Sequence, residues 1–383
     1  MRQKTRDEHL FGPGPKRLLA LDGGGVRGIV SLAYLERIER LLRERSGGDP
    51  DFRLCDYFDL IGGTSTGAII ATALAVGFPV ERIVELYRTM MPQVFKTSRW
   101  RIGLRTPKYS HDPLARLLEE QFGDITLGSS SVRTGLVIVT KRFDTGSPWI
   151  IHNSPRGKFF DHPSAPNKEF LLRDVVRAST AAAPYFGPKK LRVGEDVEGV
   201  FIDGGVSPYN NPALQLLMVA TLEGFGFGWP VGPECLFLLS VGTGSQSLDF
   251  QPDRAFRMPS AMVGLRSVRS VIADSSWLNQ TILQWISNSP TPWEVDREVG
   301  DLGGDLLGGR EWLSYVRYDL RLEAEWLAER LGVERQREVL RDLAELDRPK
   351  NVEALAELGA AAAAVQVQGE HFPETFDLSD DSG

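Results

Sequence analysis

Residues 57–70 have the sequence YFDLIGGTSTGAII, two apolar runs joined by a glycine-rich turn. The first run predicts a buried strand at Tyr57–Ile61, and the second begins a helix at Ala68–Val76. The turn between them, GTSTG at residues 63–67, fits the G-x-S-x-G pattern of a nucleophile elbow, which places a serine on a tight strand-to-helix turn. The alternative is a glycine-rich turn in which Ser65 is incidental.

An earlier glycine turn lies between a predicted strand at Leu18–Leu21 and a predicted helix at Ile29–Arg45. Its spacing, Gly-x-Gly-x-x-Gly over residues 23–28, fits the dinucleotide-binding fingerprint. That fingerprint also needs a second strand with an acidic residue about 20 positions on, whereas residues 43–51 (RERSGGDPD) are charged and turn-forming. The same kind of turn can hold the oxyanion of an ester under attack, and the missing strand favours that interpretation.

A serine nucleophile needs a base, and two candidates fit the sequence. Ser65, Asp203 and His371 follow the chain order of an α/β-hydrolase triad, although His371 lies in a terminal segment that no predicted strand delivers. Alternatively, Asp203 acts alone: it leaves an apolar strand directly into Gly204, and a partly desolvated carboxylate with a raised pKa can take the serine proton. A turn-capping aspartate is the ordinary structural alternative.

Composition narrows the class of protein. The chain has 383 residues, of which 42% are hydrophobic, and a net charge of −7 without a basic run, which argues against nucleic-acid binding. Its two cysteines make neither a metal-binding pattern nor a disulfide framework. The charged N-terminus does not resemble a signal peptide, and no apolar run approaches the roughly 20 residues of a membrane span. We therefore expect a cytoplasmic protein without a transmembrane segment.

Short apolar runs alternate with amphipathic stretches, which is typical of an α/β sheet with helices on its faces. We expect a flexible N-terminus at residues 1–15, a main domain at 16–310, accessory helices and a strand at 311–374 packed on the same domain, and a disordered acidic tail at 375–383. Further strands are predicted at Gly135–Thr140, Phe201–Asp203, Cys235–Val241 and Tyr315–Glu323.

Three tryptophans, Trp277, Trp285 and Trp293, recur at eight-residue spacing in a predicted helical region. A helical aromatic stripe is more often part of a core than of a membrane contact, so we favour the core interpretation. Aromatic residues also suit a bilayer interface, and this segment is a candidate lid.

The ordered motifs resemble the patatin-like phospholipase family. They are DGGGVRG at residues 22–28, GTSTG at 63–67 and DGG at 203–205, with secondary landmarks at residues 178–186, 210–212 and 240–244. The resemblance covers roughly residues 16 to 245. Several motifs in the right order make a chance match very unlikely.

The resemblance implies a three-layer α/β/α fold with a mostly parallel central sheet, and a Ser–Asp dyad without histidine. Carried over residue by residue, Ser65 is the nucleophile and Asp203 is its base. The implied oxyanion hole consists of the backbone N–H groups of Gly23, Gly24 and Gly25. The implied elbow and supporting residues are Gly63, Gly67, Arg27, Gly204 and Asn211. Arg27 would orient the glycine loop, meet a lipid phosphate or pair with Glu36, and Asn211 would hold the Asp203 loop.

The activity implied by the resemblance is that of a lipid acyl hydrolase of the phospholipase A or lysophospholipase type, acting through an acyl-enzyme on phospholipid or lysophospholipid at a membrane or micelle surface. No metal and no cofactor are implied, and the location expected is cytoplasmic with peripheral contact to membranes. Two alternatives stay open: an effector phospholipase switched on by a cyclic nucleotide or a protein partner, and a Ser-His-Asp esterase.

Overall fold

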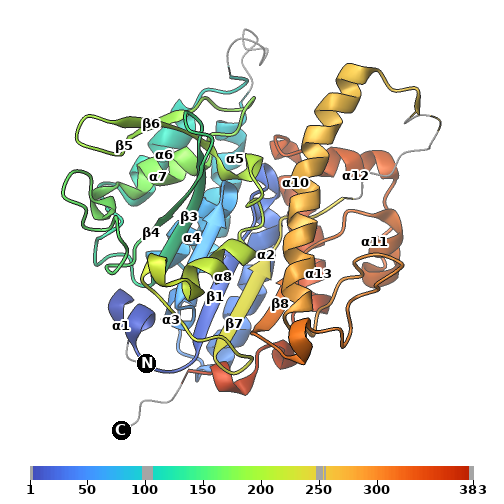
Figure 1. The fold of residues 1–383 in the computed structure, drawn as a ribbon. Coiled ribbons are helices and arrows are strands. Elements are labelled where there is room, and N and C mark those ends of the chain that lie inside the picture. The colour runs from blue at the N-terminus through green and yellow to red at the C-terminus, as the bar shows by residue number, and fades with distance from the viewer. Residues whose placement is uncertain (1–2, 97–106, 247–252, 254–255, 379–383) are drawn as a thin grey trace.

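The computed structural model describes residues 3–96, 107–246, 253 and 256–378. In this part of the chain, eight strands form one sheet in the order β5-β6-β3-β2-β1-β7-β8, with β4 paired to β3 (Figure 1). Five neighbouring strands, β3, β2, β1, β7 and β8, run parallel to one another. Strands β4 and β6 run antiparallel to β3. Their bounds are β1 Lys16–Leu21, β2 Leu60–Thr64, β3 Gly135–Arg142, β4 Pro148–His152, β5 Lys189–Arg192, β6 Glu198–Asp203, β7 Leu236–Val241 and β8 Ser314–Tyr318.

Helices cover both faces of the sheet. The described helices are α1 Arg6–Phe11, α2 Gly28–Arg45, α3 Leu54–Tyr57, α4 Thr66–Ala75, α5 Val80–Val94, α6 Asp112–Phe122, α7 Leu172–Ser179, α8 Ala213–Thr221, α10 Ser260–Trp285, α11 Ala324–Leu331, α12 Arg337–Leu343 and α13 Val352–Gln366. Figure 1 shows α8 and α10 on the near side of the sheet.

The central strand shows why the fold has three layers. All six residues of β1 are buried, as expected for a parallel strand covered on both faces. Leu19 and Leu21 join a core with α2, α4 and α5. Leu18 and Ala20 point the other way and join a core with α8 and Leu283 of α10. The predicted three-layer α/β/α fold with a mostly parallel sheet is confirmed.

The predicted strands differ from the observed ones at one or both ends, and two of them differ most. The strand expected at Tyr57–Ile61 is β2, Leu60–Thr64, because Asp56 accepts the backbone N–H of Arg53 and the residues before the strand turn into α3. The strand expected at Tyr315–Glu323 ends at Tyr318. There the carboxylate of Asp319 accepts the N–H groups of Gly244 and Leu320, which interrupts the ladder before a single parallel bridge joins Ser245 and Arg321.

Both ends of the chain are more ordered than expected. Residues 6–11 form α1, which begins with a capping box at Thr5 and buries His9 and Leu10. At the other end Phe376 is fully buried against Phe237 of β7; residues 379–383 of the predicted tail lie outside the described part. The expected accessory region contributes β8 to the main sheet and packs α13 on α2.

A substitution at Leu10 tests whether α1 is part of the fold. Leu10 is 1% exposed, lies against Gly135 of β3, and its carbonyl accepts the indole N–H of Trp229. Leu10→Ala is expected to lower the free energy of unfolding by about 2–5 kcal/mol. The measurement is urea denaturation, with Val339→Ala at an exposed site of α12 as the control that changes little. Equal stability of the two variants would mean that the N-terminus is flexible after all.

Candidate active site

Ser65 lies on the strand-to-helix turn that the sequence predicts, between the last residue of β2 and the first of α4. Its backbone has φ 55° and ψ −120°, a conformation that a residue with a Cβ adopts only under strain and that is typical of functional sites. A Cβ on Gly63 would overlap the carbonyl of Gly67, and a Cβ on Gly67 would overlap the carbonyl of Leu21. Both positions therefore require glycine, and the serine side chain is left partly exposed.

Asp203 ends β6 and faces the serine. The Ser65 hydroxyl donates a hydrogen bond of 2.5 Å to Oδ2 of Asp203, and Oδ1 accepts the N–H of Gly205 at 2.7 Å. The carboxylate is 2% exposed, and burial raises its pKa to about 6, opposed by these two hydrogen bonds and by the charge of Arg177. A Cβ on Gly204 would come within 2.6 Å of the carbonyl of Val139, so the turn after Asp203 also requires glycine.

Ser179 holds the backbone of the elbow, a role that sequence reasoning missed. Its hydroxyl accepts the backbone N–H of Ser65 at 2.8 Å and donates to the carbonyl of Val139 at 2.6 Å. The sequence singled out residues 178–186 only as a landmark of the family. Since Ser179 is 114 residues away from Ser65, no local pattern could indicate this contact.

The glycine loop lies beside the serine: a Cβ on Gly23 would be 3.2 Å from the Cβ of Ser65. The N–H of Gly23 already donates to the carbonyl of Asn210 at 3.1 Å, which differs from its expected place in an oxyanion hole. No bond donated by the N–H groups of Gly24 or Gly25 occurs within the described residues. These two amides are the candidate oxyanion donors, and a Cβ on Gly24 would overlap Thr243.

A buried ion pair fixes the start of this loop. The guanidinium of Arg317 in β8 donates to both carboxylate oxygens of Asp22 at 2.9 and 2.7 Å, to Ser240 at 2.7 Å and to Asp319 at 3.1 Å. Arg317 is 4% exposed. Burial raises the pKa of Asp22 to about 6, and the charge of Arg317 opposes that rise. Asp22 is therefore ionised and paired at neutral pH.

The far side of the loop contacts the C-terminal part of the chain. The N–H of Val26 donates to the carbonyl of Leu346 at 2.9 Å, and the hydroxyl of Tyr87 in α5 donates to the carbonyl of Gly25. Gly25 has φ 56°, and a Cβ there would overlap the Leu346 carbonyl. The loop is thus held on two sides by segments far away in the sequence.

In the described part of the chain, Arg27 does not make one of its three expected contacts, the ion pair with Glu36, and Asn211 differs from its expected contact. Among the described residues no ion pair joins Arg27 to Glu36, and its Nε is buried without a hydrogen-bond partner; burial lowers its pKa. The amide of Asn211 accepts the N–H of Ala213 at the start of α8. Its neighbour Asn210 contacts the site instead: its Oδ1 lies over Gly205, and its amide donates to the carbonyl of Gly23.

The histidines lie elsewhere. The ring of His371 bonds the hydroxyl of Tyr318 at 2.9 Å, not Ser65 or Asp203. The ring contacts of the remaining four are His9 with Asp59, His111 with Asp112, His152 with Phe225 and Phe227, and His162 with Ser164. The structure therefore brings together the dyad and not the alternative triad.

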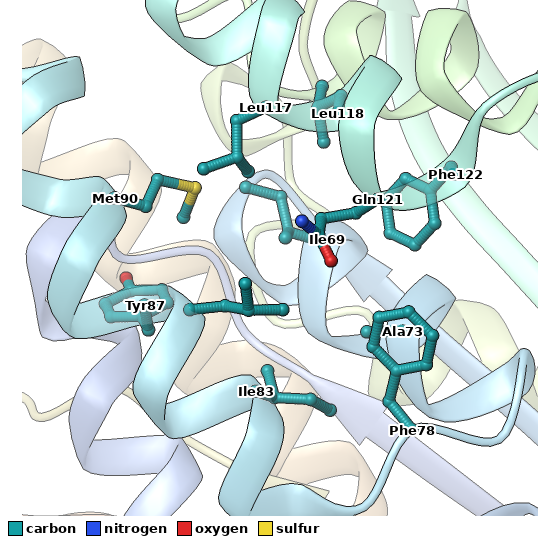
Figure 2. A pocket seen from close by; sticks show the side chains of 11 residues that line it. Ile69, Ala73, Phe78, Ile83, Tyr87, Met90, Leu117, Leu118, Gln121 and Phe122 are labelled. Atoms are coloured by element: carbon teal, nitrogen blue, oxygen red, sulfur yellow. The ribbon is translucent and has the colours of Figure 1, made fainter.

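An apolar pocket begins one helical turn after Ser65. Figure 2 shows its lining from α4, α5 and α6, including Ile69, Ala73, Tyr87 and Phe122. The space inside is about 20 Å³, enough for about one water molecule. An acyl chain therefore needs a movement of these helices or a different route.

The tryptophans differ from the favoured core interpretation. Trp277 and Trp285 are 37% and 42% exposed, and Trp277 meets Trp293 edge to face with ring centroids 6.0 Å apart.

Within the described ranges, no group of three or more His, Cys, Asp or Glu side chains is arranged to hold a metal ion. In the same part of the chain, no helix has the length and apolar composition needed to cross a bilayer.

A three-layer α/β/α fold that carries a serine on a strand-to-helix elbow defines the structural class to which many serine hydrolases belong. Comparison with known proteins places the chain within that class. The model of the family described as patatin-like phospholipase matches residues 19–217, slightly more than half of the 383 residues. The chain therefore belongs to the patatin-like phospholipase family.

Relatives come from plants and bacteria. Patatin-17 of Solanum cardiophyllum is 31% identical over 246 residues, which cover 60% of this chain and 61% of the relative. A cGAMP-activated phospholipase of Escherichia coli (strain TW11681) is 30% identical and covers 62% and 64%, respectively. The chain thus spans about three-fifths of the length of these relatives. The structural alignment with human GIVD cytosolic phospholipase A2 covers 96% of this chain and 59% of that protein's chain, with a TM-score of 0.45 and 12% sequence identity.

The ion pair with Asp22 predicts an effect of Arg317 on turnover. Arg317→Lys keeps the charge but loses the bidentate hydrogen bond to Asp22, which fixes the start of the glycine loop. We therefore expect kcat for a short soluble ester to fall about tenfold to a hundredfold with little change in KM. Arg337→Lys, at an exposed ion pair with Glu325, is the matched control. A kcat equal to that of the control would show that the loop does not depend on Arg317.

The raised pKa of Asp203 predicts the pH dependence. A base works only when deprotonated, so kcat/KM is expected to be full above pH 7 and to fall about tenfold per unit below about pH 6. Arg177→Met removes a charge that lowers the pKa of Asp203. In this variant the fall of kcat/KM should therefore begin at a higher pH. If kcat/KM of both proteins falls only near pH 4, the base does not have the raised pKa expected for the buried Asp203.

Proposed function

We propose that this protein is a lipid acyl hydrolase that cleaves fatty-acyl esters through Ser65 and Asp203. The hydrogen bond of 2.5 Å between the Ser65 hydroxyl and the buried carboxylate of Asp203, made at a strained elbow, carries this proposal. Membership in the patatin-like phospholipase family supports it. The phospholipase A or lysophospholipase type is the substrate class that we infer.

In the proposed mechanism Asp203 takes the proton of the Ser65 hydroxyl while the oxygen attacks the ester carbonyl. The N–H groups of Gly24 and Gly25, which donate no bond within the described residues, stabilise the tetrahedral oxyanion. Protonated Asp203 then gives its proton to the departing alcohol, which leaves an acyl-enzyme. Water, deprotonated by the same carboxylate, attacks the acyl-enzyme and releases the fatty acid and free Ser65.

Arg27 supports an anionic lipid as the substrate. It ends the short helix η1, Gly25–Arg27, which follows the glycine loop. A buried guanidinium nitrogen without a protein partner is costly unless an anion pairs with it. We infer that Arg27 meets the phosphate of a phospholipid or lysophospholipid presented at a membrane or micelle surface.

A ligand-gated phospholipase is the second candidate function. Two bacterial relatives, from Escherichia coli and Vibrio cholerae, are described as cGAMP-activated phospholipases. The apolar pocket between α4, α5 and α6 has room for about one water molecule, which fits a site that opens only after another molecule binds. A cyclic dinucleotide such as cGAMP is the first ligand to test.

The experiment is fatty-acid release from phospholipid and lysophospholipid vesicles, with and without cGAMP. Ser65→Ala and Asp203→Asn are each expected to lower release by about a thousandfold or more, because each removes one member of the acting pair. His371→Ala is the matched control and should retain most of the activity. Circular dichroism spectra of all variants establish that they are folded.

Each outcome bears on a different part of the proposal. Release that survives in Asp203→Asn would rule out the dyad, and release lost in His371→Ala would favour a histidine triad. Release only with cGAMP would favour the gated phospholipase. If no lipid is cleaved with or without the dinucleotide, the acyl hydrolase proposal fails.

A further inference from the structure

Helix α10 has two halves with different surroundings. In the second half Asn279, Gln280, Leu283 and Gln284 are buried, and Gln284 bonds the backbone of Trp293 and Asp301. Before Asn279, the described side-chain hydrogen bonds of Ser267, Ser270 and Ser275 run within the helix itself. Figure 1 shows this end of α10 extending past the neighbouring elements.

The extending end of α10 and Phe256, which precedes the helix by four residues, expose large apolar side chains. Phe256 is 93% exposed, Met262 48%, Val263 44% and Val271 60%. We call the segment 256–274 with these four side chains the α10 projection. Met262 and Val271 are nine residues apart, which places them on opposite sides of a helix. Solvent thus surrounds apolar residues on more than one side, an arrangement that marks a contact surface.

The charge of the segment selects the partner. Between residues 256 and 274 the sequence has three arginines, Arg257, Arg266 and Arg269, and a single acidic residue, Asp274 at its end, so the segment is basic although the chain as a whole has a net charge of −7. A second copy of the same segment would bring like charges together. A basic apolar helix instead fits the interface of a bilayer with anionic lipids, where the charges attract and the apolar side chains enter the headgroup region.

The position of α10 connects this surface with the active site. The amide of Asn279 donates to the carbonyls of Pro208 at 3.0 Å and Asn211 at 3.1 Å. These carbonyls belong to the loop that follows Asp203. Leu278, the residue before Asn279, is 58% exposed. The same helix therefore carries the exposed apolar surface at one end and supports the loop of the candidate base at the other.

We propose that the α10 projection docks the protein on an anionic phospholipid surface and so brings Ser65 to its substrate. The proposal rests on the proposed function in that the surface is also the source of the lipid that is cleaved. Docking itself depends only on the exposed residues of the projection and is measurable without turnover.

The test measures co-sedimentation with vesicles of equal parts phosphatidylcholine and phosphatidylglycerol, in a Ser65→Ala background so that no lipid is consumed. The triple variant Phe256→Ser, Met262→Ser, Val263→Ser is expected to lower the partition constant about tenfold or more. Phe143→Ser, which replaces an equally apolar side chain that is 64% exposed in the β3–β4 turn, is the control and should bind normally. Binding should also weaken with added salt and on pure phosphatidylcholine vesicles.

Two further measurements separate docking from catalysis. With Ser65 restored, the triple variant should cleave a short soluble ester at the normal rate but lose about tenfold in release from the anionic vesicles. Unchanged vesicle binding by the triple variant would overturn the proposal. So would a lipid-free dimer that the triple variant converts to a monomer, because a second copy would then cover the projection. Vesicle binding without any ester cleavage would leave docking intact and refute the acyl hydrolase proposal alone.

Discussion

The backbone around Ser65 is packed so closely that Gly63 and Gly67 leave no room for a side chain. A Cβ on either residue would overlap a carbonyl, from Gly67 in the first case and from Leu21 in the second. The end of β1, the end of β2 and the start of α4 therefore touch through main chain alone. This contact puts the glycine loop after β1 beside the serine and forces the positive φ at Ser65. The remaining parts of the site are arranged around it.

The candidate site is completed by residues far beyond the segment that the family model matches, 19–217. Arg317 of β8 pairs with Asp22, Thr243 donates to the carbonyl of Gly23, and the carbonyl of Leu346 accepts the N–H of Val26. A loop that must hold an oxyanion gains from such fixed contacts, because donors that need not reorganise stabilise developing charge best. The C-terminal third of the chain thus belongs to the same structural unit as the elbow.

What the sequence could predict follows from how local each feature is. The elbow depends on neighbouring residues, so spacing and apolar runs located it, and the fold class follows from the order of strands and helices. The pairing of Asp22 with Arg317, 295 residues apart, depends on the order β1-β7-β8, which no local pattern encodes. Asn210 and Asn211 lie side by side in an irregular loop, so the sequence could not tell which one contacts the glycine loop. The exposure of Trp277 likewise depends on what packs beside α10.

Close packing has two opposed consequences for a site of this kind. Desolvation raises the pKa of the carboxylate to about 6, which makes it a stronger base than an exposed aspartate while it is still ionised at neutral pH. The apolar pocket between α4, α5 and α6, which begins at Ile69 one helical turn after Ser65, has space for about one water molecule. An acyl chain that enters this pocket must therefore displace the helices that line it. The loop of residues 207–211 follows Asp203 and is supported by Asn279 of α10, so a movement of that helix would act on the loop next to the base. A surface that binds the α10 projection is thus well placed to affect access to the serine.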